Sequence, residues 1–220
     1  MSDQPSPQPT ASAHRLLPII GGFVLVAAVA IALWWVLIGR GGSADYVYHG
    51  GVYSPAAPAA ALDLTDQHGN PFSLGQLKDK VVLVYFGYTT CPDLCPTTLS
   101  DFSTIKEGLG PLADNVAFML VTIDPDRDSE ARLSEYLKFF DPEFIGLTGD
   151  PAALTAAQQA YGVSVERVEY PESATKYLMN HSALTYLIDP EGNLLVSYPY
   201  GTTAADIEAD VRHILSEHAR

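Results

Sequence analysis

The chain has 220 residues, 47% of them hydrophobic, and a formal net charge of −14. This length allows one domain with its own hydrophobic core plus an appendage. The acidity argues against nucleic acid or anionic lipid headgroups as partners, and two cysteines are too few for a disulfide-dense scaffold.

The N-terminal part of the chain predicts a membrane anchor. Residues 1–15 begin with MSDQPSPQPTASA, a polar and proline-rich composition typical of a disordered tail. Residues 16–38 carry no charge, and about 20 apolar residues suffice to cross the hydrocarbon core. Trp34 and Trp35 lie near the end of this run, where interfacial aromatic residues anchor a helix. A cleaved signal peptide is the alternative, but its apolar region would be shorter. We expect an uncleaved transmembrane anchor at residues 16–38, followed by a Gly/Ala/Pro-rich tether at residues 41–60.

The folded domain is expected at residues 61–220, where strand and helix patterns alternate. Strands are predicted at residues 62–64, 72–74, 81–86, 116–123, 144–147, 163–168, 183–188 and 194–198. Helices are predicted to begin near Pro96, Ser129, Asp150 and Thr203. This order predicts an α/β fold with a thioredoxin-like, mixed central sheet that helices cover on both faces.

Both cysteines, Cys91 and Cys95, lie where the first buried strand gives way to a helix. A disulfide between them would close a very short loop and would stabilise the fold little. Free N–H groups at a helix start favour thiolates, which are soft ligands for copper(I) or zinc and are also disulfide partners. The pair therefore permits both metal binding and redox chemistry.

A third ligand would favour a metal site, and among six histidines His181 is the candidate. It precedes a predicted buried strand, and in a thioredoxin-like fold that loop lies beside the cysteine loop. A second polar cluster, Asp124, Asp126, Arg127 and Asp128, follows the second buried strand. This cluster is either a turn that caps the next helix or a partner surface, and the sequence leaves both interpretations open.

Several stretches of the domain resemble the SCO/SenC family of copper-binding proteins. They include VVLVYFGYTTCPDLCPTTL, VTIDPDRDSEARLSEYLKFFDPEFIGLTGDP and YLMNHSALTYLIDPEGNLL. The resemblance implies a membrane-tethered thioredoxin-like domain that binds one copper ion through Cys91, Cys95 and His181. It also implies a role in assembling the dinuclear copper (CuA) centre of cytochrome c oxidase subunit II.

Two functions stay open within this resemblance. The first is a copper metallochaperone, which is not a turnover enzyme. The second is a thiol–disulfide oxidoreductase, in which Cys91 and Cys95 cycle through a disulfide and keep the cysteines of the oxidase subunit reduced. Partners are then oxidase subunit II and an upstream copper donor or thiol reductant. We expect a single-pass protein of the inner (cytoplasmic) membrane with its C-terminal domain in the periplasm, an oxidising compartment.

Overall fold

The computed structural model describes residues 29, 31 and 46–219. The chain divides into Met1–Val47 and Tyr48–Arg220, and the second of these parts is the folded domain. The predicted tail and nearly all of the predicted anchor lie outside the described residues. Within the described residues, no helix combines the length and the apolar character needed to cross a membrane.

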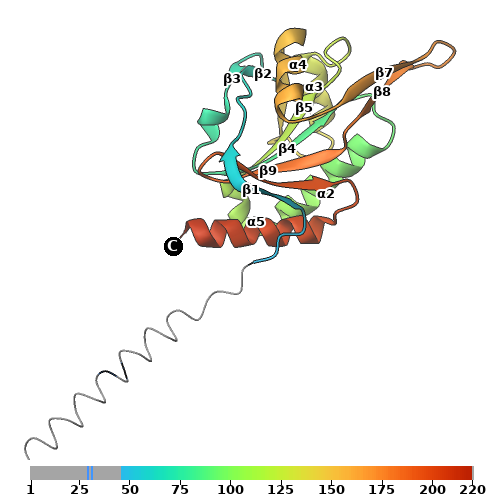
Figure 1. Cartoon of the computed structure of the whole chain (residues 1–220). Helices are drawn as coiled ribbons and strands as arrows, with labels where there is room; N and C mark the ends of the chain where they lie inside the picture. The colour runs from blue at the N-terminus through green and yellow to red at the C-terminus, as the bar shows by residue number, and fades with distance from the viewer. Residues whose placement is uncertain (1–28, 30, 32–45, 220) are drawn as a thin grey trace, which may run out of the picture. The chain divides into compact units, whose positions relative to one another are not determined.

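The domain is built on one mixed sheet with the strand order β1-β10-β9-β4-β5-β6-β2-β3 (Figure 1). Strands β4, β5 and β6 are parallel, while β9, β10 and β1 continue the sheet in antiparallel pairing on the other side of β4. Two further strands, β7 and β8, form a separate hairpin. The bounds are β1 Gly51–Pro58, β2 Leu64–Asp66, β3 Pro71–Phe72, β4 Val81–Gly87, β5 Val116–Thr122, β6 Ile145–Thr148, β7 Val165–Tyr170, β8 Lys176–His181, β9 Leu184–Ile188 and β10 Asn193–Pro199.

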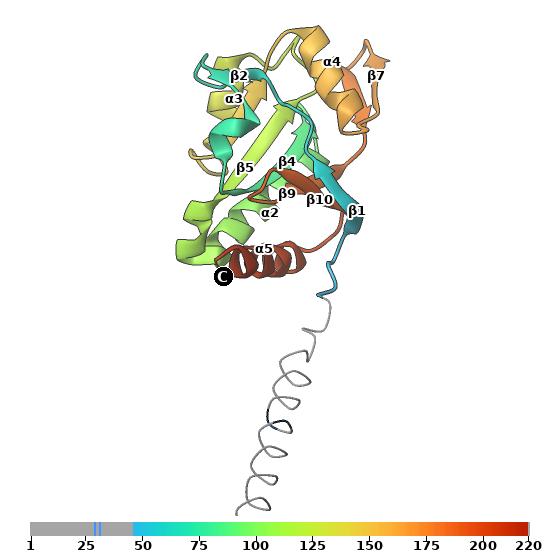
Figure 2. The same cartoon turned by 60° about the vertical axis from the view of Figure 1, so that its left-hand side comes forward.

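The described α-helices are α2 Leu94–Leu109, α3 Glu130–Leu137, α4 Pro151–Ala160 and α5 Ala204–His218, with short 3₁₀ helices at η2 Leu74–Leu77 and η3 Gly110–Asn115. Side-chain caps define three of their starts. Ser129, Asp150 and Thr203 each accept a hydrogen bond from a backbone N–H of the first turn that follows. These three helix starts confirm the predicted ones, and Figure 2 shows α5 lying beside α2.

The core is centred on β4 and β5, in which all seven residues of each strand are buried. Such continuous burial explains why both strands appear in the sequence as unbroken apolar runs. Neighbouring side chains of β4 point to opposite faces of the sheet. Tyr85 contacts Cys95 of α2, while the Phe86 ring packs 5.3 Å from the ring of Tyr161, which ends α4. Helices therefore cover both faces of the sheet, which confirms the predicted thioredoxin-like architecture.

Two segments differ from the sequence-based expectation. Residues 51–58 belong to the predicted tether, yet they form β1, which pairs with β10 at the edge of the sheet. Every residue of β1 is exposed, so no alternating apolar pattern marks it in the sequence. The β7–β8 hairpin was predicted only in part, as one strand near residues 163–168, because only one residue of its two strands is buried and no apolar pattern marks the second strand.

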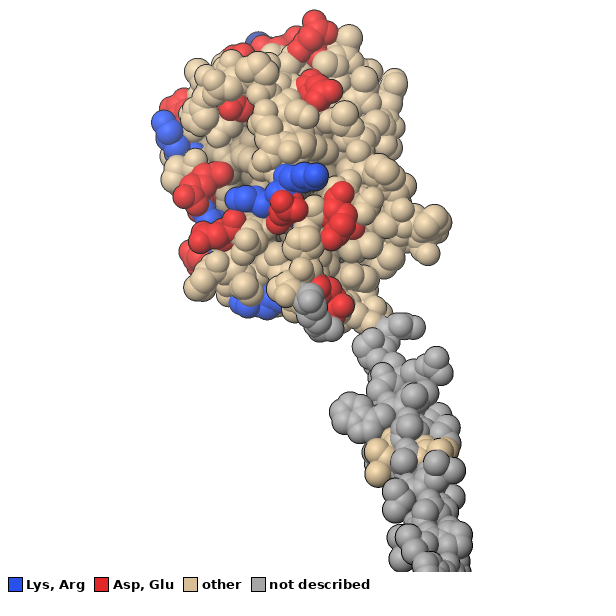
Figure 3. All heavy atoms as spheres, turned by 90° about the vertical axis from the view of Figure 1, so that its left-hand side faces the viewer, with Lys and Arg blue, Asp and Glu red and all other residues tan. Residues whose placement is uncertain are grey.

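Acidic side chains are spread over the surface of the domain. On the face in Figure 3, the few lysine and arginine side chains lie among aspartates and glutamates. Lys106, for example, contacts both Asp141 and Glu143, at 2.7 and 2.6 Å. The basic side chains are therefore partly neutralised by neighbouring carboxylates.

Candidate metal site

The cysteine loop follows β4 directly and leads into α2. Cys91 lies in the loop, where its backbone N–H donates to the carbonyl oxygen of Tyr88 at 3.3 Å. Helix α2 begins at Leu94, two positions before the predicted start near Pro96, so Cys95 is its second residue and Pro96 its third. Proline is tolerated there because N–H groups of a first helical turn have no intrahelical partner. The N–H of Cys95 points at Cys91 Sγ, 3.4 Å away, so the start of the helix stabilises negative charge on that sulfur.

The two sulfurs occupy different environments. Cys91 is partly exposed, whereas Cys95 is completely buried; both thiols are free. The hydroxyl of Tyr85 lies 3.8 Å from Cys95 Sγ and donates to it. Gly87 makes room for the same sulfur, because a Cβ on this residue would lie only 2.9 Å from it. The end of β4 thus shapes the pocket that holds Cys95.

His181, the last residue of β8, brings an imidazole to the cysteines. Its Nε2 lies 3.9 Å from Cys95 Sγ, and its Nδ1 lies 3.1 Å from the carbonyl oxygen of Ser182. A carbonyl accepts only, so Nδ1 carries the proton and Nε2 presents its lone pair towards the sulfur. The rings of Tyr85 and Tyr88 meet the imidazole edge-on, at centroid distances of 5.9 and 6.2 Å. The three residues singled out in the sequence therefore come together.

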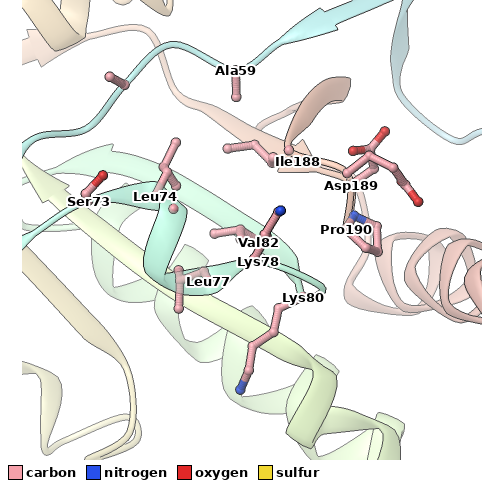
Figure 4. Close-up of a pocket in the computed structure, with 14 residues that line it drawn as sticks. Ala59, Ser73, Leu74, Leu77, Lys78, Lys80, Val82, Ile188, Asp189 and Pro190 are labelled. Carbon is pink, nitrogen blue, oxygen red and sulfur yellow. The ribbon is translucent and has the colours of Figure 1, made fainter.

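A groove of about 390 Å³ gives access to this group. It is lined by Tyr88, Cys91, Pro92, Asp93, Leu94, Leu178, Met179, Asn180 and His181. Cys91 is the cysteine that opens onto the groove. A different cavity, of about 330 Å³, is lined by residues such as Leu74, Lys78 and Ile188 and by none of the three candidate ligands (Figure 4). The groove, and not this cavity, is therefore the place where a metal ion or a partner would reach the candidate ligands.

Hydrogen bonding makes the two cysteines electrostatically unequal. Hydrogen bonding with Cys95 is the main cause that lowers the pKa of Cys91, to about 4, and the neighbouring His181 and the backbone N–H groups of Asp93 and Cys95 lower this pKa further. The same contact and burial raise the pKa of Cys95 above its ordinary value. Burial also raises the pKa of Tyr85, so its hydroxyl keeps its proton and serves as a donor to Cys95. Cys91 is therefore the cysteine that ionises first in the metal-free pair.

The donor set fits a soft metal ion. Two sulfurs and one neutral imidazole are ligands that copper(I) and zinc accept. With metal–sulfur and metal–nitrogen bonds of about 2.3 and 2.0 Å, two ligands of a trigonal ion lie about 3.7 Å apart. The 3.9 Å between Cys95 Sγ and His181 Nε2 is close to this value. Among the residues that the structure describes, however, no three histidine, cysteine or carboxylate side chains already form a closed ligand group. Binding therefore requires at least one donor to move.

The second polar cluster of the sequence lies behind this site. Asp124 and Asp128 are buried, with 3% and 0% of their surfaces exposed. Asp128 accepts hydrogen bonds from Thr89 and Thr122, whereas Asp124 accepts from Arg127 and Tyr177. Asp126 is exposed and pairs with Arg167. The interpretation of this cluster as a partner surface stays a prediction, and the internal contacts give the two buried carboxylates a structural role.

Sequence reasoning missed the residues that shape the site. Tyr85 and Gly87 belong to a run of buried strand residues, so the sequence gives them no role besides packing. Their position within the last three residues of the strand before the cysteine loop is the signal that could have identified them. Tyr88 was missed in the same way, although its hydroxyl accepts a hydrogen bond from the N–H of Met179.

Comparisons with known proteins find relatives over most of the folded domain. The family model described as SCO1/SenC matches residues 53–216. The SCO2-like protein of Rickettsia felis is 38% identical over 146 residues, which cover 66% of this chain and 71% of that protein. The structure of Bradyrhizobium japonicum ScoI with copper bound is 36% identical, with a TM-score of 0.66 over 72% of this chain and 100% of that chain. Apo Sco1 from Thermus thermophilus is 34% identical, with a TM-score of 0.69 over 79% and 100%.

Proposed function

This chain belongs to the SCO1/SenC family, and we propose that it binds one copper(I) ion through Cys91, Cys95 and His181 and transfers it to a partner. The observation that carries the proposal is the approach of His181 Nε2 to Cys95 Sγ, beside the Cys91 thiolate. ScoI of Bradyrhizobium japonicum has been solved with copper bound, which supports the same cargo here. We further propose, from the family resemblance, that the recipient is the CuA centre of cytochrome c oxidase subunit II.

The unequal exposure of the ligands suits transfer of a metal ion. Cys95 is buried and fixed at the start of α2, so it holds the ion from the inside of the domain. Cys91 and His181 line the groove, where a partner's thiolate or imidazole can approach. A site with three soft ligands leaves room for an entering fourth ligand, so the ion can pass on by ligand exchange.

Copper stoichiometry tests this proposal. The purified protein in detergent, with reduced thiols, should bind one copper(I) against a competing chelator, with sulfur and nitrogen scattering in X-ray absorption. Cys91→Ser and Cys95→Ser should abolish tight binding. His181→Ala should remove the nitrogen contribution and weaken binding at least as much as the loss of an outer contact does, which is about 10–100-fold. His68→Ala, in an exposed turn, is the matched control. Unchanged affinity in His181→Ala would remove the histidine from the site.

A second function, thiol–disulfide exchange, is favoured by the Cys91 thiolate in the groove and the buried Cys95 behind it. The Cys91 thiolate would attack a partner disulfide, releasing one partner thiolate and forming a mixed disulfide. Cys95, after losing its proton, would then attack Cys91 Sγ and release the second partner thiolate. The domain would be left with a Cys91–Cys95 disulfide, which an upstream dithiol must reduce. His181→Ala separates the two functions, because reduction of a model disulfide needs no imidazole ligand.

We also propose that residues 16–38 anchor the protein in the inner membrane with the domain in the periplasm. The support is the uncharged apolar run in the sequence. An anchored domain would act on a membrane-bound oxidase without diffusing away.

A further inference from the structure

The hairpin that carries His181 stands apart from the central sheet. Strands β7 and β8 pair only with each other, from Val165↔His181 at the base to Tyr170↔Lys176 near the tip. Only Tyr177 of the two strands is buried, so the hairpin has little buried apolar surface of its own. An isolated two-stranded hairpin is only marginally stable in water. Specific side-chain contacts must therefore hold it, and with it the imidazole of His181, against the body of the domain.

Arg127, in the loop after β5, makes several of these contacts. Its Nη1 donates to the carbonyl oxygens of Thr175 and Tyr177, at 3.0 and 3.1 Å, and its Nε donates to Asp124. Its guanidinium lies 3.6 Å from the centroid of the Tyr177 ring. The hydroxyl of Tyr177 in turn donates to Asp124 at 2.8 Å. One arginine of the body thus holds the backbone and the ring of β8 at the same point.

A second arginine completes the arrangement from the hairpin side. The guanidinium carbon of Arg167 lies 3.5 Å from the centroid of the same Tyr177 ring. Two guanidinium groups this close to one centroid would overlap on a single face, so they lie on opposite faces of the ring. Arg167 also pairs with Asp126 at 3.2 Å, across to the body. We call Asp124, Asp126, Arg127, Arg167 and Tyr177 the hairpin clamp.

One donor group of Arg127 takes no part in these hydrogen bonds. Its Nη2 is buried and has no hydrogen-bond partner among the described residues. A buried donor without a partner costs free energy, which the other contacts must offset. The guanidinium also lies 5.7 Å from the centroid of Tyr88, a residue that lines the groove. The side chain therefore occupies a costly position between the hairpin and the candidate metal site.

The clamp connects to both halves of that site. Along β8, the clamped Tyr177 is four residues before His181, and between them the N–H of Met179 donates to the Tyr88 hydroxyl. At the other end of the same loop, Asp128 holds Thr89, which is two residues before Cys91. Residues 124–128 thus contact the segment that carries the histidine and the segment that carries the cysteines.

We propose that Arg127 is a positioning residue that, through Tyr177 and the hairpin clamp, holds His181 within reach of Cys91 and Cys95. The inference rests on the proposed copper ligation by these three residues. Arg127 contacts no ligand itself and acts only through β8. Loss of the clamp lets the hairpin open and raises the separation between the imidazole and the sulfurs, while the cysteine pair stays in place.

The first test uses the reduced, metal-free full-length protein in detergent. Edge-on contacts with Tyr85 and Tyr88 give the ring protons of His181 a characteristic NMR shift, and amide exchange reports opening of residues 176–181. In Arg127→Met, we expect the ring shifts to move towards those of an exposed histidine. The Met179 amide should exchange at least about tenfold faster, since charged hydrogen bonds that oppose local opening are lost.

Three further variants keep this test decisive if Arg127→Met folds poorly. Tyr177→Phe removes the hydroxyl contact but keeps the ring, and Arg167→Met removes only the hairpin-side arginine, so both should give smaller shifts in the same direction. Arg127→Lys should not restore the wild-type signals, because an ammonium cannot reproduce the forked contacts or the stacking. Arg212→Met is the matched control, since Arg212 also contacts a carboxylate, Glu208, and a carbonyl, that of Gly108.

The second test is a double-mutant cycle on copper(I) affinity. Arg127→Met should weaken copper(I) binding by about 10–100-fold, which is the usual effect of losing an outer contact of a metal ligand. In a His181→Ala background the same substitution should have no further effect. Equal weakening in both backgrounds, or unchanged His181 ring shifts in Arg127→Met, would overturn the positioning role. If the wild-type protein binds no copper, the proposed function fails, and the ring shifts and amide exchange still decide whether Arg127 holds His181.

Discussion

The buried carboxylate of Asp128 accepts hydrogen bonds from both the backbone N–H and the hydroxyl of Thr89, at 3.0 and 2.6 Å. Thr89 is two residues before Cys91, so this contact fixes the entry of the cysteine loop against the loop that follows β5. A third hydrogen bond, from Thr122, holds the same carboxylate to the end of β5. The position of the Cys91 sulfur therefore depends on a residue that contacts no ligand.

Replacing Asp128 by asparagine should destabilise the domain and loosen this loop. Asparagine offers one acceptor oxygen in place of two and turns an NH₂ group towards donors. We expect a loss of about 1–3 kcal/mol in the free energy of unfolding, the range for a buried polar group left without its partner. Urea unfolding measures this loss, with the exposed Asp63→Asn as control. Equal midpoints for the two variants would contradict the role given to Asp128.

Adding a methyl group to Gly87 should disturb the metal site more than the fold. The Cβ of Gly87→Ala would lie 2.9 Å from Cys95 Sγ and 2.8 Å from a ring carbon of Tyr85, so the sulfur or the ring must shift. Overpacking of this kind typically costs about 1–3 kcal/mol. We expect weaker copper(I) binding at a temperature where the variant is still folded. Gly75→Ala is the control, because its added Cβ would have only Ser73 Oγ nearby, at 4.0 Å. Wild-type affinity in Gly87→Ala would show that Cys95 tolerates displacement.

The two cysteines of the reduced, metal-free protein should differ in reactivity. Because the pKa of Cys91 is lowered to about 4, its thiolate is fully formed above about pH 5.5. Its alkylation rate should then be nearly constant up to pH 8, whereas an ordinary thiol with a pKa of about 8.5 slows about tenfold for each pH unit below that value. Cys95, buried and with a raised pKa, should react far more slowly. Mass spectrometry of each cysteine at several pH values measures both rates.

A steep rise of the Cys91 rate between pH 6 and pH 8 would mean that Cys95 does not stabilise the Cys91 thiolate. Cys95→Ser is a useful companion variant, since a hydroxyl is a different donor to the thiolate. In that variant, the decline of the Cys91 rate at low pH should begin at a different pH.

The membrane anchor gives a prediction on the N-terminal segment. An uncleaved helix at residues 16–38 should keep the protein in washed membranes, and protease added to spheroplasts should release the domain from the outer side. A chain that begins at residue 46 should not sediment with membranes. Recovery of a mature protein that begins near Gly41 would instead identify residues 1–40 as a cleaved signal.

The sequence predicted the central sheet well because its strands are defined by local composition. The run from Val81 to Phe86 is apolar without interruption, which is typical of a strand buried on both faces, and the structure confirms it as β4. The same reasoning located β5. Helix starts were equally local, since Asp150 followed by Pro151 places an N-cap next to a residue with the right φ for a first helical turn.

The features that the sequence did not reveal depend on contacts between distant segments. Asp124 and Asp128 lie in a stretch rich in charge, which suggests an exposed loop. They are nevertheless buried, and their carboxylates accept hydrogen bonds from the hydroxyls of Thr89, Thr122 and Tyr177 and from the guanidinium of Arg127 in the same loop. Nothing in the local sequence near Arg127 indicates that it stacks on Tyr177, 50 residues away. Residue type was enough to identify the candidate ligands, but the residues that hold these ligands in place could not be identified from the sequence.

Because residues 51–58 form strand β1, the segment that would connect the domain to a membrane anchor is shorter than predicted. The folded part begins at Tyr48, and the backbone N–H and ring of His49 are already bound to the buried carboxylate of Asp210 on α5. With an anchor ending at Ile38, only residues 39–47 connect it to the domain. Nine fully extended residues span about 30 Å at most. A twenty-residue tether would reach about twice as far. If the proposed anchor and copper transfer are correct, a recipient must present its own site close to the membrane surface, within this short distance.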